Sequence, residues 1–168
     1  MRLKQGFNRN LSIPSHYDIV TRVKFIAAIL LMKRYALSYL ATLFSYLLLD
    51  YLWLGLVSQQ AYQTAIGHLM RDDIPVWPWV TFYLIYAAVV VKIIIAVLPG
   101  QQPVIAFAHG CLFGLAAYGA YNLTNYAILA SWPLDITVKD WLWGAFVSGA
   151  ISYCGYVMYN SRLAISSK

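Results

Sequence analysis

The sequence predicts an all-α protein, an integral membrane bundle of four transmembrane helices with a short interfacial helix after the first. Three observations lead to this fold class. Of the 168 residues, 61% are hydrophobic and only 11% are charged, whereas an average soluble domain has about 25% charged residues. The apolar residues gather into four segments, each near the roughly 20 residues that a helix needs to cross a bilayer. The tryptophans fall at the ends of those segments, where membrane meets water.

Residues 1–31 form a basic N-terminal extension. Residues 1–34 hold seven Lys or Arg and one acid, a net charge of +6, whereas the rest of the chain holds five of each sign. Such a flank before an apolar span is typical of the cytoplasmic side, which is a simpler explanation than a patch that binds nucleic acid. The apolar run 23–31 is too short to cross a bilayer, and Met32 is a plausible native start. We expect 1–31 to be a mobile cytoplasmic arm or a start assigned too early.

The first half of the transmembrane domain, which is predicted over residues 32–162, contains two spans. The first runs from Tyr35 to Val57, long and apolar enough to cross the bilayer as a helix. The loop 58–73 then places apolar residues at helical spacing, which predicts a short helix lying on the outer membrane surface. The second span runs from Trp77 to Leu98.

The second half of the domain contains the other two spans. The stretch Pro-Gly-Gln-Gln-Pro, 99–103, predicts a tight hairpin, because proline and glycine mark turns and helix ends. The third span is predicted from Val104 to Leu129 and the fourth from Thr137 to Tyr159, with Pro133 between them. A short cytoplasmic tail, 163–168, follows the domain.

Two independent features agree on sidedness. With the N-terminus inside, four spans return the C-terminus to the cytoplasm, and the outer loops then carry only Arg71 and Lys139 as basic residues. All the tryptophans then fall on the outer side, where their rings favour the headgroup boundary. They are Trp53, Trp77, Trp79, Trp132, Trp141 and Trp143.

Small residues predict which helices pack closely. The third span contains Gly110 and Gly114 in a Gly-x-x-x-Gly spacing, and the fourth carries small residues along one face. Small residues allow close approach of helix backbones in lipid, so we expect these two spans to pack on each other. A dimer interface is the alternative. The small residues of the fourth span are Gly144, Ser148, Ser152 and Gly155.

Several polar residues are predicted to lie at one depth in the outer half of the membrane. Asp50 lies about seven residues before the outer end of the first span, Asn122 and Asn125 lie at a similar depth in the third, and Asp140 begins the fourth. We expect the asparagine amides to meet Asp50 and Asp140 rather than lipid. The candidate pocket residues are Asp50, Trp53, Tyr118, Asn122, Thr124, Asn125 and Asp140.

Two interpretations of these polar residues stay open. An aspartate within the membrane costs about 2.5–3.5 kcal/mol on insertion scales and usually marks a functional site. Interhelical polar contacts of about 0.6 kcal/mol can instead serve only to hold helices in register. No catalytic residue, metal or cofactor is predicted, because Cys111 and Cys154 lack any Cys/His ligand spacing and phosphate-loop, nucleophile-elbow and dinucleotide motifs are absent.

Four stretches of the chain resemble an uncharacterised bacterial family of small membrane proteins, DUF2177. They are LDYLWLGLV (49–57), AIGHLM (65–70), YGAYNLTNYAILASWPL (118–134) and DWLWGAFVSG (140–149). The resemblance covers roughly residues 32–162 and implies a four-span protein of the bacterial inner membrane without an established activity. It also implies that position 122 is often an aspartate, so that this chain carries one acid fewer there.

Three functions are compatible with these features. The leading hypothesis is a polar pocket near the outer leaflet that binds or moves a small molecule or a lipid headgroup. The second is an accessory or scaffold protein that acts through helix contacts, and the third is a membrane enzyme that modifies lipids by acid–base chemistry. The expected partners are membrane lipids, with a homo-oligomer or a larger membrane complex left open and no nucleic acid.

Overall fold

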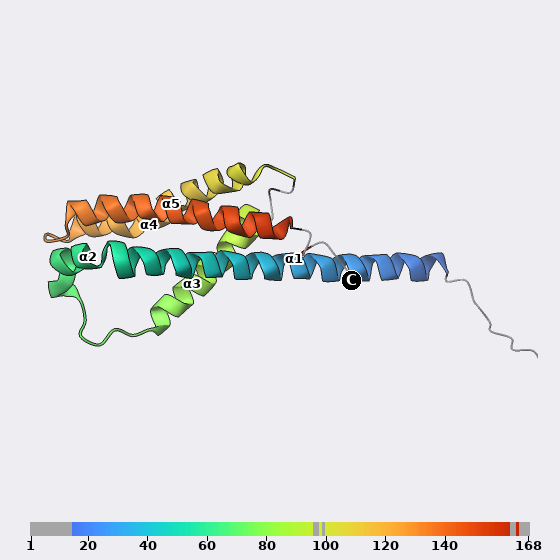
Figure 1. Cartoon of the computed structure of the whole chain (residues 1–168), viewed down its shortest axis with the longest axis horizontal. Helices are drawn as coiled ribbons and strands as arrows, with labels where there is room; N and C mark the ends of the chain where they lie inside the picture. The colour runs from blue at the N-terminus through green and yellow to red at the C-terminus, as the bar shows by residue number, and fades with distance from the viewer. Residues whose placement is uncertain (1–14, 96–97, 99, 162–163, 165–168) are drawn as a thin grey trace, which may run out of the picture.

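The computed structural model describes residues 15–95, 98, 100–161 and 164, and within them the chain is helical between short turns, without strands (Figure 1). The all-helical prediction is therefore confirmed. The main helices are α1 (His16–Leu52), α2 (Gln59–Ile66), α3 (Trp77–Val89), α4 (Pro103–Ile128) and α5 (Leu134–Tyr159). The π-helical turns η1 (Trp53–Val57) and η3 (Val90–Ile95) continue α1 and α3, and the 3-10 turn η2 (Gly67–Leu69) continues α2.

The first helix starts earlier than the sequence analysis expected. It begins at His16, well before Tyr35, because Ser15 caps it. The backbone N–H of Asp18 donates to Ser15 Oγ at 3.2 Å, and the backbone N–H of Ser15 donates to Asp18 Oδ2 at 3.1 Å. This capping box satisfies two N–H groups at the helix start. The predicted N-terminal extension is thus helical from His16 onward, and residues 1–14 lie outside the described part of the chain.

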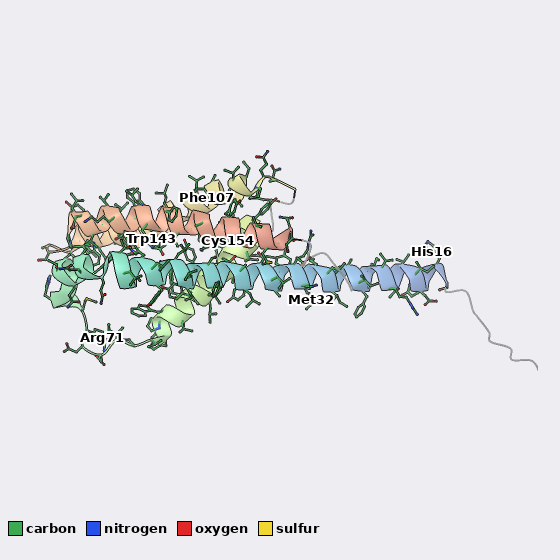
Figure 2. The ribbon with its side chains drawn as sticks, in the orientation of Figure 1. His16, Met32, Arg71, Phe107, Trp143 and Cys154 are labelled. Atoms are coloured by element: carbon green, nitrogen blue, oxygen red, sulfur yellow. The ribbon has the colours of Figure 1, made fainter. Side chains whose placement is uncertain are left out.

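Together α1 and η1 form one long apolar rod, His16–Val57, of 42 residues. At about 1.5 Å per residue the rod is roughly 63 Å long, about twice the hydrocarbon thickness of a bilayer. Figure 1 shows its N-terminal half projecting beyond the other helices, and Figure 2 marks His16 at its far end.

Three helical segments of the described chain are long and apolar enough to cross a membrane: His16–Val57, Trp77–Ile95 and Pro103–Ile128. They correspond to the first three predicted spans. α5 has the same length as α4, 26 residues, but Asp135, Lys139 and Asp140 lie in its first turns and lower its hydropathy.

Glycines bring α4 and α5 into close contact, as predicted. A Cβ on Gly110 would overlap the Ser148 carbonyl oxygen and the Ser152 side chain, and one on Gly114 would overlap the Gly144 carbonyl oxygen and Ser148. Because backbone atoms cannot move aside as a side-chain end can, only glycine fits at these two positions of α4.

The other face of α5 packs against α1. Ser38 Oγ donates to the Gly155 carbonyl oxygen at 2.9 Å, and a Cβ on Gly155 would overlap Thr42 Oγ1 and Ile95. Gly155 therefore permits contact with α1 and η3 rather than with α4, which differs from the predicted single interface between the third and fourth spans.

The burial pattern of α1 is the reverse of that in a soluble helix. Its buried residues are polar, at a spacing of four: Ser38, Thr42, Tyr46 and Asp50. Apolar side chains on the same stretch point outward, including Leu40 and Phe44. Polar residues toward the bundle and apolar residues outward are typical of a helix solvated by lipid.

Candidate functional site

A cavity of about 250 Å³ lies at the end of the bundle nearest α2, between α1, α3, α4 and α5. Two acidic residues line it, Asp50 from α1 and Asp140 from α5, and most of the remaining lining is aromatic. The lining residues are Asp50, Trp53, Leu54, Tyr62, Trp79, Phe82, Tyr83, Tyr86, Ala117, Tyr118, Tyr121, Asp140 and Trp143.

Asp50 ends the buried polar stripe of α1 and is 6% exposed. Both of its carboxyl oxygens accept hydrogen bonds: Oδ1 from Trp143 Nε1 at 2.9 Å and Oδ2 from the Tyr83 hydroxyl at 2.8 Å. The two donors belong to α5 and α3. One carboxyl group thus joins three helices at the edge of the cavity.

Asp140 is buried to a similar degree, at 5% exposure, and its surroundings follow the same pattern. Its Oδ1 accepts from the Tyr62 hydroxyl at 2.5 Å and its Oδ2 accepts from Asn122 Nδ2 at 2.8 Å. Tyr62 comes from α2 and Asn122 from α4. This second carboxyl group therefore holds the short helix α2 against the bundle.

A tryptophan pair connects the surroundings of the two acids. The rings of Trp53 and Trp143 are stacked, with centroids 4.6 Å apart and planes 5° from parallel. Trp143 thereby contacts η1 through its ring and Asp50 through its N–H. Figure 2 labels Trp143 on α5, on the side toward α1.

Two of the tyrosines that line the cavity, Tyr86 and Tyr118, form hydrogen bonds with buried residues behind its wall. The hydroxyl oxygens of Tyr46 and Tyr118 are 2.5 Å apart in a shared hydrogen bond, and the Tyr86 and Ser148 hydroxyl oxygens are 2.6 Å apart. Because Ser148 Oγ donates to the Gly144 carbonyl oxygen at 2.6 Å, Tyr86 is the donor in its bond with Ser148.

Tyr62, which lies outside the spanning helices, remains a neutral donor. Burial raises the pKa of its hydroxyl, and the neighbouring charge of Asp140 raises it further. The hydroxyl therefore keeps its proton, and its hydrogen bond to Asp140, throughout the physiological pH range.

The structure brings together most, but not all, of the residues predicted from the sequence. Asp50, Trp53, Tyr118 and Asp140 line the cavity. Asn122 is fully buried, and its side-chain amide donates to Asp140. The predicted depth of Asn122 also allowed Asp50 as its partner.

The other two predicted polar residues lie away from the acids. Thr124 is exposed and its hydroxyl donates to the Ala120 carbonyl oxygen of its own helix. Asn125 is half-buried and does not line the cavity. A helix turns about 100° per residue, so Thr124 points about 160° away from Asn122, whereas Asn125 is offset by about 60° and lies nearly one turn closer to the end of α4.

Three donors to the acids were not among the predicted pocket residues: Tyr62, Tyr83 and Trp143. In the sequence, Trp143 has the position of a membrane-boundary tryptophan, and Tyr62 has the spacing of the apolar residues of a surface helix. Tyr83 carried no distinguishing pattern, because tyrosines are frequent in this chain.

The two carboxyl groups of the cavity have no ion-pair partner among the described residues. The ion pairs of the described residues, Arg71–Asp73 and Lys139–Asp135, both lie on the surface at 3.4 Å and include neither pocket acid. Among the same residues no group of three or more His, Cys, Asp or Glu side chains is arranged to hold a metal ion. The arrangement can accept hydrogen bonds and a positive charge, and it contains no paired nucleophile and base.

Comparison with known proteins gives one match. The family model of DUF2177, described as a predicted membrane protein, matches residues 35–157. No curated protein and no solved structure matches the chain. The matched residues include both acids of the cavity and exclude the N-terminal part of α1.

Proposed function

The chain belongs to the DUF2177 family of predicted membrane proteins, and from this premise we propose that it binds a small molecule or a lipid headgroup in the cavity between Asp50 and Asp140. The observation that carries the proposal is that two buried carboxyl groups, from α1 and α5, line one cavity of about 250 Å³. If these polar groups served only to hold the helices together, they would fill the space between the helices. Here the two hydrogen-bonded groups border a space large enough for a ligand.

The proposal includes a four-span arrangement with α5 as the fourth span. Its 26 residues give a length of roughly 39 Å, enough to cross a hydrocarbon core of about 30 Å. Its polar residues Asp140, Ser148 and Ser152 are buried in the bundle, whereas Leu142 and Phe146 point outward. The mean hydropathy of the helix gives its buried and its outward-facing residues equal weight. It therefore underestimates how apolar the outward face of α5 is.

Orientation and location follow from charge and tryptophan placement. We place both termini in the cytoplasm of a bacterial inner membrane, with the basic N-terminal residues inside. The cavity then lies near the outer leaflet, because Trp53, Trp79 and Trp143 line it and tryptophan favours the headgroup boundary. In this arrangement α2 is the interfacial helix, and Tyr62 attaches it to Asp140.

Native mass spectrometry of the protein released from lipid nanodiscs tests the proposal. We expect the wild type to retain a bound molecule and the Asp50→Asn/Asp140→Asn double variant to lose it while remaining folded. Asp135→Asn is the matched control, because this acid is exposed and lies in the first turn of the same helix as Asp140. Equal retention by all three proteins would contradict a site at the two acids, and unfolding of the double variant alone would favour the structural role.

A second function, as a scaffold, is favoured by the N-terminal half of α1. This half projects from the bundle (Figure 1) and exposes large apolar side chains such as Phe25 and Met32, which are 67% and 71% exposed. Sedimentation of the full chain and of a version that starts at Met32 would compare their assembly states. Loss of a larger assembly in the shorter version would support the scaffold, and identical sedimentation would count against it.

A further inference from the structure

We infer that the cavity between Asp50 and Asp140 takes an organic ammonium group, carried by a lipid headgroup or by a free amine. This inference rests on the proposed function and names the ligand class for the same site. It depends on three features of the cavity: the direction of the hydrogen bonds to the two acids, the lack of a neighbouring protein cation and the aromatic walls.

The hydrogen-bond donors around the two acids favour their carboxylate forms. An indole N–H can only donate, so the Trp143 bond identifies Asp50 Oδ1 as an acceptor, and Tyr83 supplies a second donor to Oδ2. Asp140 likewise accepts at both oxygens, from Tyr62 and from the Nδ2 amide group of Asn122. The Trp143 indole and the Asn122 amide nitrogen can only donate, so at least one oxygen of each acid accepts a hydrogen bond. Two donors around each carboxyl group are the arrangement that stabilises a negative charge.

No side chain in the described chain balances these charges. The described ion pairs lie on the surface and use other acids, and the closest polar neighbours of Asp50 and Asp140 are the neutral donors named above. Buried charges are costly unless they are paired. A ligand that brings a positive charge into the cavity would therefore be attracted by both carboxylates.

The walls select an organic cation over a metal ion. Aromatic rings from η1, α3, α4 and α5 surround the cavity, among them Trp53, Trp79, Phe82, Tyr121 and Trp143. A cation over an aromatic face is attracted by the ring, and quaternary ammonium ligands are recognised by such cages. Ca²⁺ instead needs six or more oxygen ligands, mostly carboxylate, carbonyl and water oxygens, whereas the four carboxyl oxygens here already accept hydrogen bonds and the other side-chain oxygens of the lining are tyrosine hydroxyls. A cavity of about 250 Å³ also accommodates a group much larger than a metal ion.

Choline and its neutral isostere 3,3-dimethyl-1-butanol provide the decisive comparison, because they differ mainly in charge. The wild-type protein in nanodiscs of phosphatidylglycerol, which has no ammonium group, would be titrated with each while tryptophan fluorescence is recorded. Trp53 and Trp143 stack at the cavity and are expected to report occupancy. We expect choline to bind at least about tenfold more tightly, as the cation–π attraction at a desolvated site implies.

Variants connect that difference to the two acids. Asp50→Asn and Asp140→Asn should each weaken choline binding about tenfold or more, whereas Asp135→Asn should bind as the wild type does. The comparison of choline with its isostere uses only the wild type, so it remains valid if an acid variant unfolds.

Nanodiscs of different composition distinguish the two sources of the ammonium group. Retention of phosphatidylethanolamine or phosphatidylcholine, but not phosphatidylglycerol, after release into the mass spectrometer would identify a headgroup. Choline binding with none of the three lipids retained would identify a free amine, and either result supports the inference.

The two proposals fail in different ways. Equal binding of choline and 3,3-dimethyl-1-butanol, or equal retention of all three lipids with loss in the Asp50→Asn/Asp140→Asn variant, would overturn the ammonium assignment and leave the pocket intact. If the wild type binds neither probe and retains no lipid, the proposed function itself is wrong.

Discussion

Trp143 of α5 donates its indole N–H to the Asp50 carboxylate of α1 across 2.9 Å. The same ring stacks on Trp53, so one side chain both aligns two helices and forms the cavity wall. Residues that position the candidate site are therefore also residues that hold the bundle together. A variant at such a residue can therefore change both the stability of the bundle and the site, and a matched control variant separates the two effects.

The sides of the membrane on which the two chain ends lie distinguish four spans from three. Reporter fusions to the two ends should both report the cytoplasm, because an even number of spans returns the chain to the side on which it began. A fusion within the loop that contains Arg71 should report the opposite side. Termini on opposite sides of the membrane would rule out α5 as a fourth span and with it the proposed depth of the cavity.

Replacing Trp143 with Phe should lower the free energy of unfolding by about 1–3 kcal/mol, because Asp50 loses one of its two donors in a buried site. Trp79→Phe is the control, since Trp79 lines the same cavity but is 55% exposed and makes no described hydrogen bond. Thermal unfolding in detergent micelles measures both. Equal destabilisation would indicate that ring size, and not the N–H bond to Asp50, is what matters.

The glycine contact between α4 and α5 should not tolerate a side chain. Gly114→Leu should cost about 1–3 kcal/mol, since overpacked contacts force helices apart and the Gly144 carbonyl oxygen cannot move away. Gly55→Ala is the control, because its Cβ would come no closer than 3.7 Å to Tyr51, and its effect should stay within about 0.5 kcal/mol. Denaturation by a strong detergent gives the comparison; a Gly114→Leu protein as stable as Gly55→Ala would argue against the interface.

Asn122 and Asn125 should differ in their contribution to stability although they lie one helical turn apart. Asn122→Ala removes a donor to the buried Asp140 and should cost about 1–3 kcal/mol. Asn125→Ala should change the free energy of unfolding by less than about 0.5 kcal/mol, because Asn125 is only half-buried and does not line the cavity. The reverse order would show that Asn125 is the amide that pairs with an acid.

The raised pKa of Tyr62 predicts that the protein loses stability at alkaline pH. Burial raises its pKa above the usual 10.0, so the folded protein holds the proton more tightly than the unfolded chain does. Its contribution to stability is complete below pH 10.0 and is lost as the pH rises from there toward the folded pKa. Unfolding temperatures measured between about pH 8 and 11 should fall more steeply for the wild type than for Tyr62→Phe. The exposed residue Tyr17 supplies the control, since Tyr17→Phe should keep the wild-type slope.

Much of the architecture could be predicted from the sequence, because it depends on local properties of the chain. The apolar segments correspond to α1, α3, α4 and α5, and the Gly-x-x-x-Gly of α4 meets the small residues of α5 as expected. The sequence gives directly both the hydrophobicity of a stretch of about 20 residues and the size of each residue. The early start of α1 also has a local signal in the sequence, because Ser15 and Asp18 have the spacing of a capping box. The basic residues around this signal favour an interpretation as a cytoplasmic flank.

The sequence alone thus determined that this is a membrane-type helical protein with acids at Asp50 and Asp140 within its apolar segments. Only the tertiary structure decided that Asn122 pairs with Asp140, and that Trp143 and Tyr83 pair with Asp50. The reason is geometric: each residue along a helix turns the side chain by about 100°, so a partner depends on how the helices are rotated and which of them are neighbours. Depth in the membrane follows from the position in the chain, whereas rotation and neighbourhood arise from packing of all the helices together.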